Sequence, residues 1–143
     1  MPRMIFVNLP VADVAAATAF YEALGFEKNP QFSNEQASCM VCSDTIHFML
    51  LSHDFFQGFL PEGQTIAARG TTQAIICLSQ DSRDAVDRMA EAAGKAGGRI
   101  GFPGDQNDAV MYGRAFADLD GHLIENMHMD LAAFAEMQAE HAA

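Results

Sequence analysis

The feature that most constrains the fold of this chain is an internal repeat, in which one pattern of elements occurs twice. A shift of 69 residues superimposes three pairs of positions: Asp13 on Ser82, Phe20 on Met89 and Gly25 on Gly94. Asp and Ser commonly precede a helix, and Gly commonly follows one. The first and last pairs therefore delimit one helix in each copy, and the middle pair lies on its apolar face.

Runs of apolar and β-branched residues around these helices predict four strands in each copy. In the first copy the expected strands are residues 4–10, 26–33, 36–42 and 45–52, and in the second they are residues 72–79, 99–102, 110–117 and 122–129. A shift of 76 residues places Met49 in the last strand of the first copy on Glu125 in the second. The pattern predicts an α+β fold in which two tandem β-α-β-β-β modules form a half-barrel cleft.

The two modules are expected to form a single domain. Module 1 covers about residues 4–52 and module 2 about residues 72–129, followed by a C-terminal helix over residues 131–141. Residues 53–71 connect the modules, with one helical turn at most, and contain Phe55, Phe56 and Phe59. A loop anchored on the core is the favoured interpretation of this segment, and a cover for a pocket or a subunit contact is the alternative.

Composition narrows the classes of partner and location. The chain has 8 Lys and Arg against 19 Asp and Glu, a net charge of -11, which repels phosphate backbones and anionic lipids. We therefore expect no nucleic-acid partner and no membrane partner. The odd number of cysteines (Cys39, Cys42 and Cys77) argues against a complete disulfide framework and favours a cytoplasmic location. The spacing of Cys39 and Cys42 permits redox chemistry, but their place in a strand favours packing.

Several motifs resemble those of the vicinal-oxygen-chelate superfamily, which includes glyoxalase I, extradiol dioxygenases and the bleomycin- and fosfomycin-resistance proteins. The resemblance rests on Asp13, on Phe20-Tyr21, on residues 24–26 and on residues 116–125, which are similar to the closing signature of the family. It covers nearly the whole chain and implies a homodimer that holds a small-molecule ligand in the cleft. It does not imply one activity, because the superfamily supports many chemistries on one scaffold.

Metal enzymes of the superfamily carry ligands at four places, which the resemblance maps onto Phe6, Met49, Ile75 and Glu125. Only Glu125 offers a donor suited to an oxygen-preferring divalent ion, so no cofactor is expected. The alternative is a divalent metal bound by Glu125 and His47. Residues two apart in a strand share a face, so Asn8 joins Phe6, Cys77 joins Ile75 and His47 joins Met49. A register shift of two would then gather a different set: Asn8, His47, Cys77 and Glu125.

The leading functional prediction is a glyoxalase- or dioxygenase-like protein that acts on a small organic molecule, as a lyase or isomerase with Glu125 as catalytic base. A carboxyl group in an apolar cleft can act as a base, since burial raises its pKa. The alternative is a non-catalytic protein that binds or sequesters a small molecule, such as a cationic antibiotic, in the manner of the bleomycin-resistance group. The candidate ligand-binding residues are Asn8, His47, Met49, Tyr112, Arg114 and Met127.

Arg114 or His47 is expected to pair with Glu125, since the face that holds this carboxylate is otherwise apolar, and a cationic ligand is the alternative partner. For Arg114 and Tyr112, which share a strand face, the sequence leaves two interpretations open. One is contact with a ligand, and the other, slightly favoured, is a surface ion pair.

Overall fold

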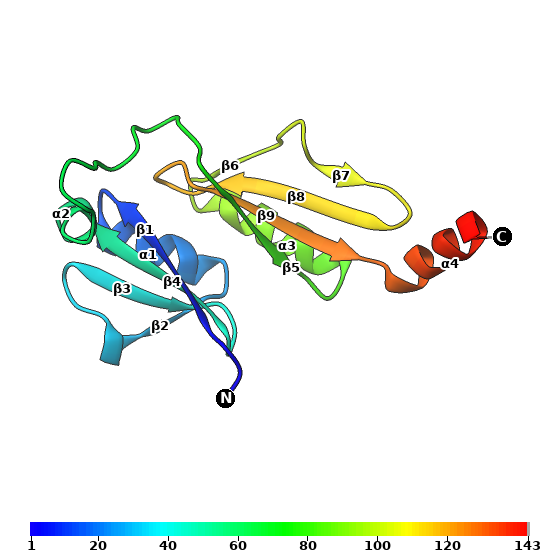
Figure 1. The fold of residues 1–143 in the computed structure, drawn as a ribbon, viewed down its shortest axis with the longest axis horizontal. Helices are drawn as coiled ribbons and strands as arrows, with labels where there is room; N and C mark the ends of the chain where they lie inside the picture. Colours follow the sequence, from blue (N-terminus) through cyan, green and yellow to red (C-terminus); the bar gives the residue numbers. More distant parts are fainter. Residues whose placement is uncertain (143) are drawn as a thin grey trace. The chain divides into compact units, whose positions relative to one another are not determined.

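The structure is a computed structural model that describes residues 1–142 (Figure 1). The chain divides into two compact units: unit 1 comprises Met1–Gln73 and Asp118–His122, and unit 2 comprises Ala74–Ala117 and the chain from Leu123 onward. Each unit contains a mixed sheet and the helix that follows its first strand, so the predicted α+β class of two β-α-β-β-β modules is confirmed. The assignment of both modules to a single domain stays a prediction.

The elements of unit 1 are β1 (Ile5–Val11), α1 (Val14–Ala23), β2 (Glu27–Asn29), the 3-10 helix η1 (Pro30–Phe32), β3 (Ala37–Val41), β4 (Ile46–Ser52) and α2 (His53–Gln57). The sheet order is β1-β4-β3-β2, with β1 parallel to β4 and the other pairs antiparallel. The strand expected over residues 26–33 is wrong beyond Asn29. Pro30 has no N–H for a ladder hydrogen bond, and its fixed φ suits the start of a helical turn.

Helix α1 begins and ends where the sequence predicts. The Asp13 side chain accepts a hydrogen bond from the backbone N–H of Ala16 at 3.0 Å, which satisfies one free donor of the first turn. Gly25 follows the helix with a φ of 100°, a left-handed conformation that favours glycine. The buried face of α1 carries the Tyr21 ring, whose centroid lies 5.2 Å from that of Phe26 and 5.5 Å from that of Phe48. These rings form the core of unit 1.

A short segment from late in the chain, Asp118–His122, belongs to unit 1. The Tyr21 hydroxyl donates a hydrogen bond to Asp118 Oδ2 at 2.6 Å, and both residues are buried. Asp120 accepts a hydrogen bond from the Ala12 backbone N–H at 2.8 Å. Burial, followed by the charge of Asp118, raises the pKa of Tyr21 well above its ordinary value of 10.0. This aspartate-rich segment, part of the signature noted in the sequence, therefore has a structural role in unit 1.

The elements of unit 2 are β5 (Ile75–Ser79), α3 (Arg83–Lys95), β6 (Arg99–Ile100), β7 (Gln106–Asn107), β8 (Met111–Ala117), β9 (Leu123–Met129) and α4 (Leu131–Ala142). The sheet order is β5-β9-β8-β6, with β7 also paired to β8 and β5 parallel to β9. Strand β7 lies between the strands expected over residues 99–102 and 110–117, where the sequence predicts none, so residues 1–142 contain nine strands rather than the expected eight. None of the helices in this part of the chain is long and apolar enough to cross a membrane.

Helix α3 begins as predicted but ends later. The Ser82 hydroxyl accepts a hydrogen bond from the Ala85 N–H at 3.0 Å, as expected of the residue before a helix. The prediction that Gly94 ends the helix is wrong, because α3 continues to Lys95 and the left-handed residue is Gly97, with a φ of 103°. A Cβ on Gly94 would lie 3.1 Å from Cδ1 of Ile100, so this glycine makes room for β6.

The hydrogen-bonding register confirms that the modules repeat residue by residue. In unit 1, Met49 lies between Asn8 on β1 and Cys39 on β3. In unit 2, Glu125 lies between Cys77 on β5 and Ala115 on β8. The shift of 69 residues converts Asn8 to Cys77, and the shift of 76 converts both Cys39 to Ala115 and Met49 to Glu125. The two sequence shifts therefore align residues that occupy equivalent positions in the two sheets.

Candidate functional site

In each unit the helix covers one face of the sheet, and the opposite face carries a patch of four side chains from the two parallel strands. Block 1, on β1 and β4, consists of Phe6, Asn8, His47 and Met49. Block 2, on β5 and β9, consists of Ile75, Cys77, Leu123 and Glu125. The shared faces predicted from the sequence are confirmed, because residues two apart in a strand point the same way. The shifts of 69 and 76 convert each member of block 1 to one of block 2.

Block 1 is aromatic and polar without a carboxylate. The Phe6 ring stacks on the His47 ring, with centroids 4.5 Å apart and planes inclined by 17°, and Phe6 is still 46% exposed. His47 Nδ1 is buried and has no hydrogen-bond partner in residues 1–142. Asn8 is exposed and donates to the Phe6 carbonyl at 3.4 Å, while Met49 is half-buried. Block 1 thus offers an accessible ring face and an amide.

Block 2 places one carboxylate among apolar side chains. Glu125 is half-buried and lies directly opposite Cys77 on β5. Its Oε1 lies 3.9 Å from the position that a Cβ would take on Gly113, so that glycine leaves room beside the carboxylate. Met127, a predicted ligand-binding residue, follows on the same face. Desolvation, and then the charge of Glu125, raises the pKa of the Cys77 thiol from its ordinary value of 9.0.

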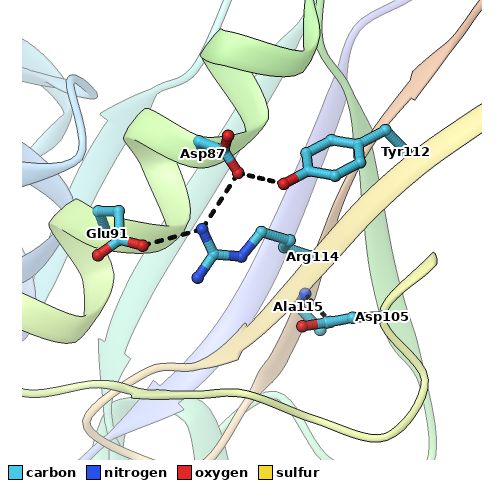
Figure 2. A network of polar contacts seen from close by, with 6 residues as sticks. All are labelled: Asp87, Glu91, Asp105, Tyr112, Arg114 and Ala115. Atoms are coloured by element: carbon cyan, nitrogen blue, oxygen red, sulfur yellow. Dashed lines mark hydrogen bonds and ion pairs between the residues drawn. The ribbon is translucent and has the colours of Figure 1, made fainter. Parts of the chain in front are cut away.

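Tyr112 and Arg114 lie on the other face of the unit 2 sheet, against α3 (Figure 2). Arg114 Nη1 donates to Asp87 Oδ1 at 3.1 Å and to Glu91 Oε1 at 2.9 Å, and the Tyr112 hydroxyl donates to Asp87 Oδ1 at 2.5 Å. The ion-pair interpretation of Arg114 is therefore confirmed, and its predicted pairing with Glu125 is wrong. Arg114 lies opposite Asn126 in the register, and adjacent residues of a strand alternate between faces.

This polar cluster holds α3 against β8. The hydrogen bond from Tyr112 lowers the pKa of Asp87 below its ordinary 3.8, and the bond and charge of Arg114 act in the same direction against partial desolvation. The same hydrogen bond raises the pKa of Tyr112 above 10.0. Asp87 therefore stays charged over the neutral range. The prediction that Tyr112 and Arg114 bind a ligand stays a prediction, but any such ligand would meet them on the face opposite Glu125.

Asn126 is a buried polar residue that the sequence reasoning missed. Its side chain is fully buried, and Oδ1 accepts a hydrogen bond from Gln80 Nε2 at 3.0 Å. Nδ2 has no partner among the residues that the structure describes. The shift of 76 could have singled it out, because it places Asn126 on Leu50, an ordinary core residue.

The residues present do not fit the divalent metal site that the fold family implies. Of the four positions mapped from the resemblance, Phe6 and Ile75 have no donor atom and Met49 has only a soft thioether. Within residues 1–142 there is no group of three or more His, Cys, Asp or Glu placed to hold a metal ion. The alternative of a metal bound by Glu125 and His47 stays a prediction, as does the expectation of no cofactor.

Comparison with known proteins shows a family match near the N-terminus and a shared fold over most of the chain. Residues 3–43 match the family described as Bleomycin resistance protein-like N-terminal. A hypothetical protein from S. aureus is 25% identical, with a TM-score of 0.72 over 90% of this chain and 95% of its own. An enzyme of the glyoxalase/bleomycin resistance protein/dioxygenase family from Burkholderia phytofirmans PsJN is 15% identical, with a TM-score of 0.69 over 90% of this chain and 100% of its own.

A lactoylglutathione lyase from Agrobacterium tumefaciens is 16% identical, with a TM-score of 0.63 over 90% of this chain and 94% of its own. None of the curated proteins compared with this chain matches it. The family match and the shared fold agree with the resemblance found in the sequence. This chain has the fold of proteins of the glyoxalase/bleomycin resistance/dioxygenase superfamily, also called the vicinal-oxygen-chelate superfamily, and its residues 3–43 match a family model of bleomycin resistance-like proteins.

Proposed function

We propose that this protein binds a small organic molecule on the block 2 face of unit 2, with Glu125 as the charged contact. The observation that carries the proposal is the setting of this carboxylate. It is half-buried beside Leu123 and Met127 and has no hydrogen-bond or ion-pair partner among the described residues of unit 2. Burying an unpaired carboxylate is costly, and a ligand with a positive or N–H group would remove that cost. Apolar surface with few polar groups is typical of small-molecule sites.

The simpler form of the proposal is binding without turnover. The match of residues 3–43 to the bleomycin resistance-like family supports it, and the net charge of -11 favours a cationic ligand. Glu125 then acts as an electrostatic anchor, while the apolar members of block 2 contribute contact area. A sequestering protein needs no further chemistry.

The second form is a lyase or isomerase in which Glu125 is the general base. The specific observation in its favour is that Glu125 is partly exposed and directly opposite Cys77, so a carboxylate and a thiol face the same bound molecule. The carboxylate can accept a proton from a carbon of the ligand, while the thiol donates a hydrogen bond. One structural relative is itself a lyase.

Glu125→Gln separates these forms, because it keeps the shape of the side chain and removes its charge. The probes are metal-free bleomycin in isothermal titration calorimetry and lactoylglutathione in a turnover assay. If Glu125 is an anchor, we expect the wild type to bind bleomycin without altering it chemically. The variant should then bind bleomycin about tenfold more weakly, the effect of one lost charge-assisted hydrogen bond. For a base, we expect turnover of lactoylglutathione whose kcat falls in the variant while KM does not.

The matched control is Glu22→Gln, which makes the same charge change at an exposed position of α1. It should leave both readouts unchanged. Equal binding and equal turnover in the wild type and Glu125→Gln would contradict the role of Glu125. The homodimer expected from the sequence is also part of the proposal, and light scattering should then give twice the chain mass of 15.5 kDa.

A further inference from the structure

We propose that unit 1 carries a second small-molecule site, for an organic ammonium ion, in the groove beside α2. The groove has a volume of about 340 Å³ and is lined by Gln36, Asp54, Phe55, Gly58 and Phe59. It shares no residue with block 1 or block 2. Small-molecule pockets occupy roughly 300–1,000 Å³, so this groove suits a ligand at the small end of that range.

Two aromatic rings form the wall of the groove. Phe55 and Phe59 are four residues apart, which brings their side chains to one side of the short helical turn. Their rings meet edge to face, with centroids 5.1 Å apart and planes at 84°. Phe59 is 69% exposed, so a face of this ring is open to a ligand. The face of a phenyl ring attracts a cation, and the edge-to-face contact with Phe55 fixes the orientation of the Phe59 ring.

Hydrogen bonds at both ends of α2 hold the turn beside the groove. Ser52 starts the turn by accepting a hydrogen bond from the Phe55 N–H at 3.2 Å, and Gly58 ends it. A Cβ on Gly58 would lie 3.3 Å from the Phe55 carbonyl oxygen and 3.8 Å from that of Asp54. The Gly58 N–H donates a hydrogen bond to the Asp54 carbonyl oxygen at 3.3 Å, which fixes the turn that carries the two rings.

The one charged residue that lines the groove is acidic. Asp54 is exposed, and its carboxylate has no hydrogen bond or ion pair in the described part of unit 1. None of the residues that line the groove is Lys or Arg, so a cation there meets the Asp54 carboxylate without a positive side chain in the lining.

The groove does not suit a bare metal ion. Ca²⁺ takes 6–8 oxygen ligands, whereas this groove offers one carboxylate, one amide and two phenyl rings. Alkylated ammonium ions differ, because aromatic faces recognise them without full coordination. Charge, rings and volume together assign the groove to a small ammonium compound such as choline.

The test is a titration of the ¹⁵N-labelled full chain with choline, followed by NMR. The matched neutral probe is 3,3-dimethylbutan-1-ol, which has the shape of choline without its charge. We expect choline to give saturable shifts at the backbone amides of Gln36, Phe55, Gly58 and Phe59, and the alcohol to give none there. Added NaCl should weaken choline binding, because salt screens an exposed carboxylate. Equal shifts with both probes, or choline shifts that map elsewhere, would overturn the proposal.

Paired variants locate the interaction. Asp54→Asn removes the charge and Phe59→Leu removes the ring, and each should weaken choline binding about two- to fivefold, the size of one exposed cation–π contact. Asp44→Asn and Phe32→Leu are the controls, since Asp44 is exposed and Phe32 is 67% exposed, and neither lines the groove. Equal affinity in all four variants would refute the site. Circular dichroism checks the fold, and Asp54→Asn decides the outcome if Phe59→Leu fails to fold.

Discussion

The two modules follow one plan, but different chemistry holds the helix against the sheet in each. In unit 1, the Thr18 hydroxyl on α1 donates a hydrogen bond to Ser38 on β3 at 2.8 Å, and both residues are buried. The shifts of 69 and 76 convert Thr18 to Asp87 and Ser38 to Arg114. In unit 2 these residues form an ion pair at 3.1 Å, with Asp87 44% exposed. Equivalent positions thus support the same packing with a neutral pair or with charges.

The hydrophobic cores of the two units also contain different residue types at equivalent positions. Tyr21 and Phe48 in unit 1 correspond to Ala90 and Ile124 in unit 2, so unit 2 lacks these rings. Conversely, the apolar Leu50 corresponds to the buried amide of Asn126. The strand register is nevertheless the same in both units. The shared fold therefore depends more on the alternation of buried and exposed residues in the strands, and on the residues that begin the helices, than on particular core residues. Substitutions at equivalent positions of the two units can therefore compare how much each type of contact stabilises the fold.

The largest expected effect comes from exchanging residue types at the Leu50 and Asn126 positions. Leu50→Asn should lower the free energy of unfolding by roughly 3–5 kcal/mol, because it loses apolar contacts and buries an amide without a partner. Asn126→Val should change it by less than about 1 kcal/mol, because removal of the unpartnered Nδ2 offsets the loss of the Oδ1 acceptor of Gln80, a half-buried residue. Urea denaturation measures both. Equal losses would show that the buried amide of unit 2 supports the fold as strongly as Leu50 does.

The next effect concerns the link between Tyr21 and Asp118. Tyr21→Phe removes a hydrogen bond to a charged acceptor and should cost about 1.5–3 kcal/mol near neutral pH. The raised pKa of Tyr21 stabilises the fold fully only below the ordinary value of 10.0. Above that pH the unfolded chain ionises the hydroxyl while the folded chain does not, so wild-type stability falls and the deficit of the variant shrinks.

Urea titrations below and above pH 10.0 measure this change, with Tyr112→Phe as the control. Tyr112 is a tyrosine of unit 2 whose pKa is also raised, but by a hydrogen bond rather than by deep burial. Its variant should show a smaller deficit and a weaker dependence on alkaline pH. A deficit of Tyr21→Phe that stays constant with pH would contradict the structural role of the Asp118–His122 segment.

A third comparison uses Gly25 and Gly94, which the repeat aligns but the structure treats differently. Gly25→Ala places a Cβ on a residue with a φ of 100°, and should cost about 1–2 kcal/mol. Gly94 lies inside α3, where alanine is a better helix former, so Gly94→Ala should add up to about 1 kcal/mol once the Ile100 side chain shifts. Thermal melts give the sign of each change. Two changes of the same sign would disprove the different helix ends.

The smallest effect belongs to the ion pair of unit 2. Arg114→Met should cost at most about 1 kcal/mol, and less at high salt, because the pair is partly exposed. Ser38→Ala in unit 1 should cost about 0.5–1.5 kcal/mol at any salt concentration. The lowered pKa of Asp87 contributes stability above its ordinary 3.8 that is lost as the pH falls further, so Asp87→Asn should flatten the acid limb of the stability curve. A loss of stability in Arg114→Met that does not change with salt concentration would contradict the assignment of Arg114 to a partly exposed ion pair.

Much of the fold was predictable because the signals act over a few residues. Asp13 and Ser82 begin their helices where the sequence places them, since a cap bonds to a backbone N–H three residues away. The predictions were wrong where the local structure involves a contact with another element of the fold. Gly94 lies inside α3 next to the Ile100 side chain of β6, and β7 forms where Gln106 and Asn107 pair with β8. No local pattern reports either contact.

The sequence by itself determined which residues share a strand face, and so it grouped His47 with Met49, and Leu123 with Glu125. That follows from the two-residue period of a strand, which is a local property. Only the tertiary structure decided which of these faces meets the helix and which stays open. The register of β8 against β9 places Arg114 beside Asn126 under α3 and leaves Glu125 on the opposite face. Register depends on packing between distant segments, and a shift of one residue would have exchanged the two faces.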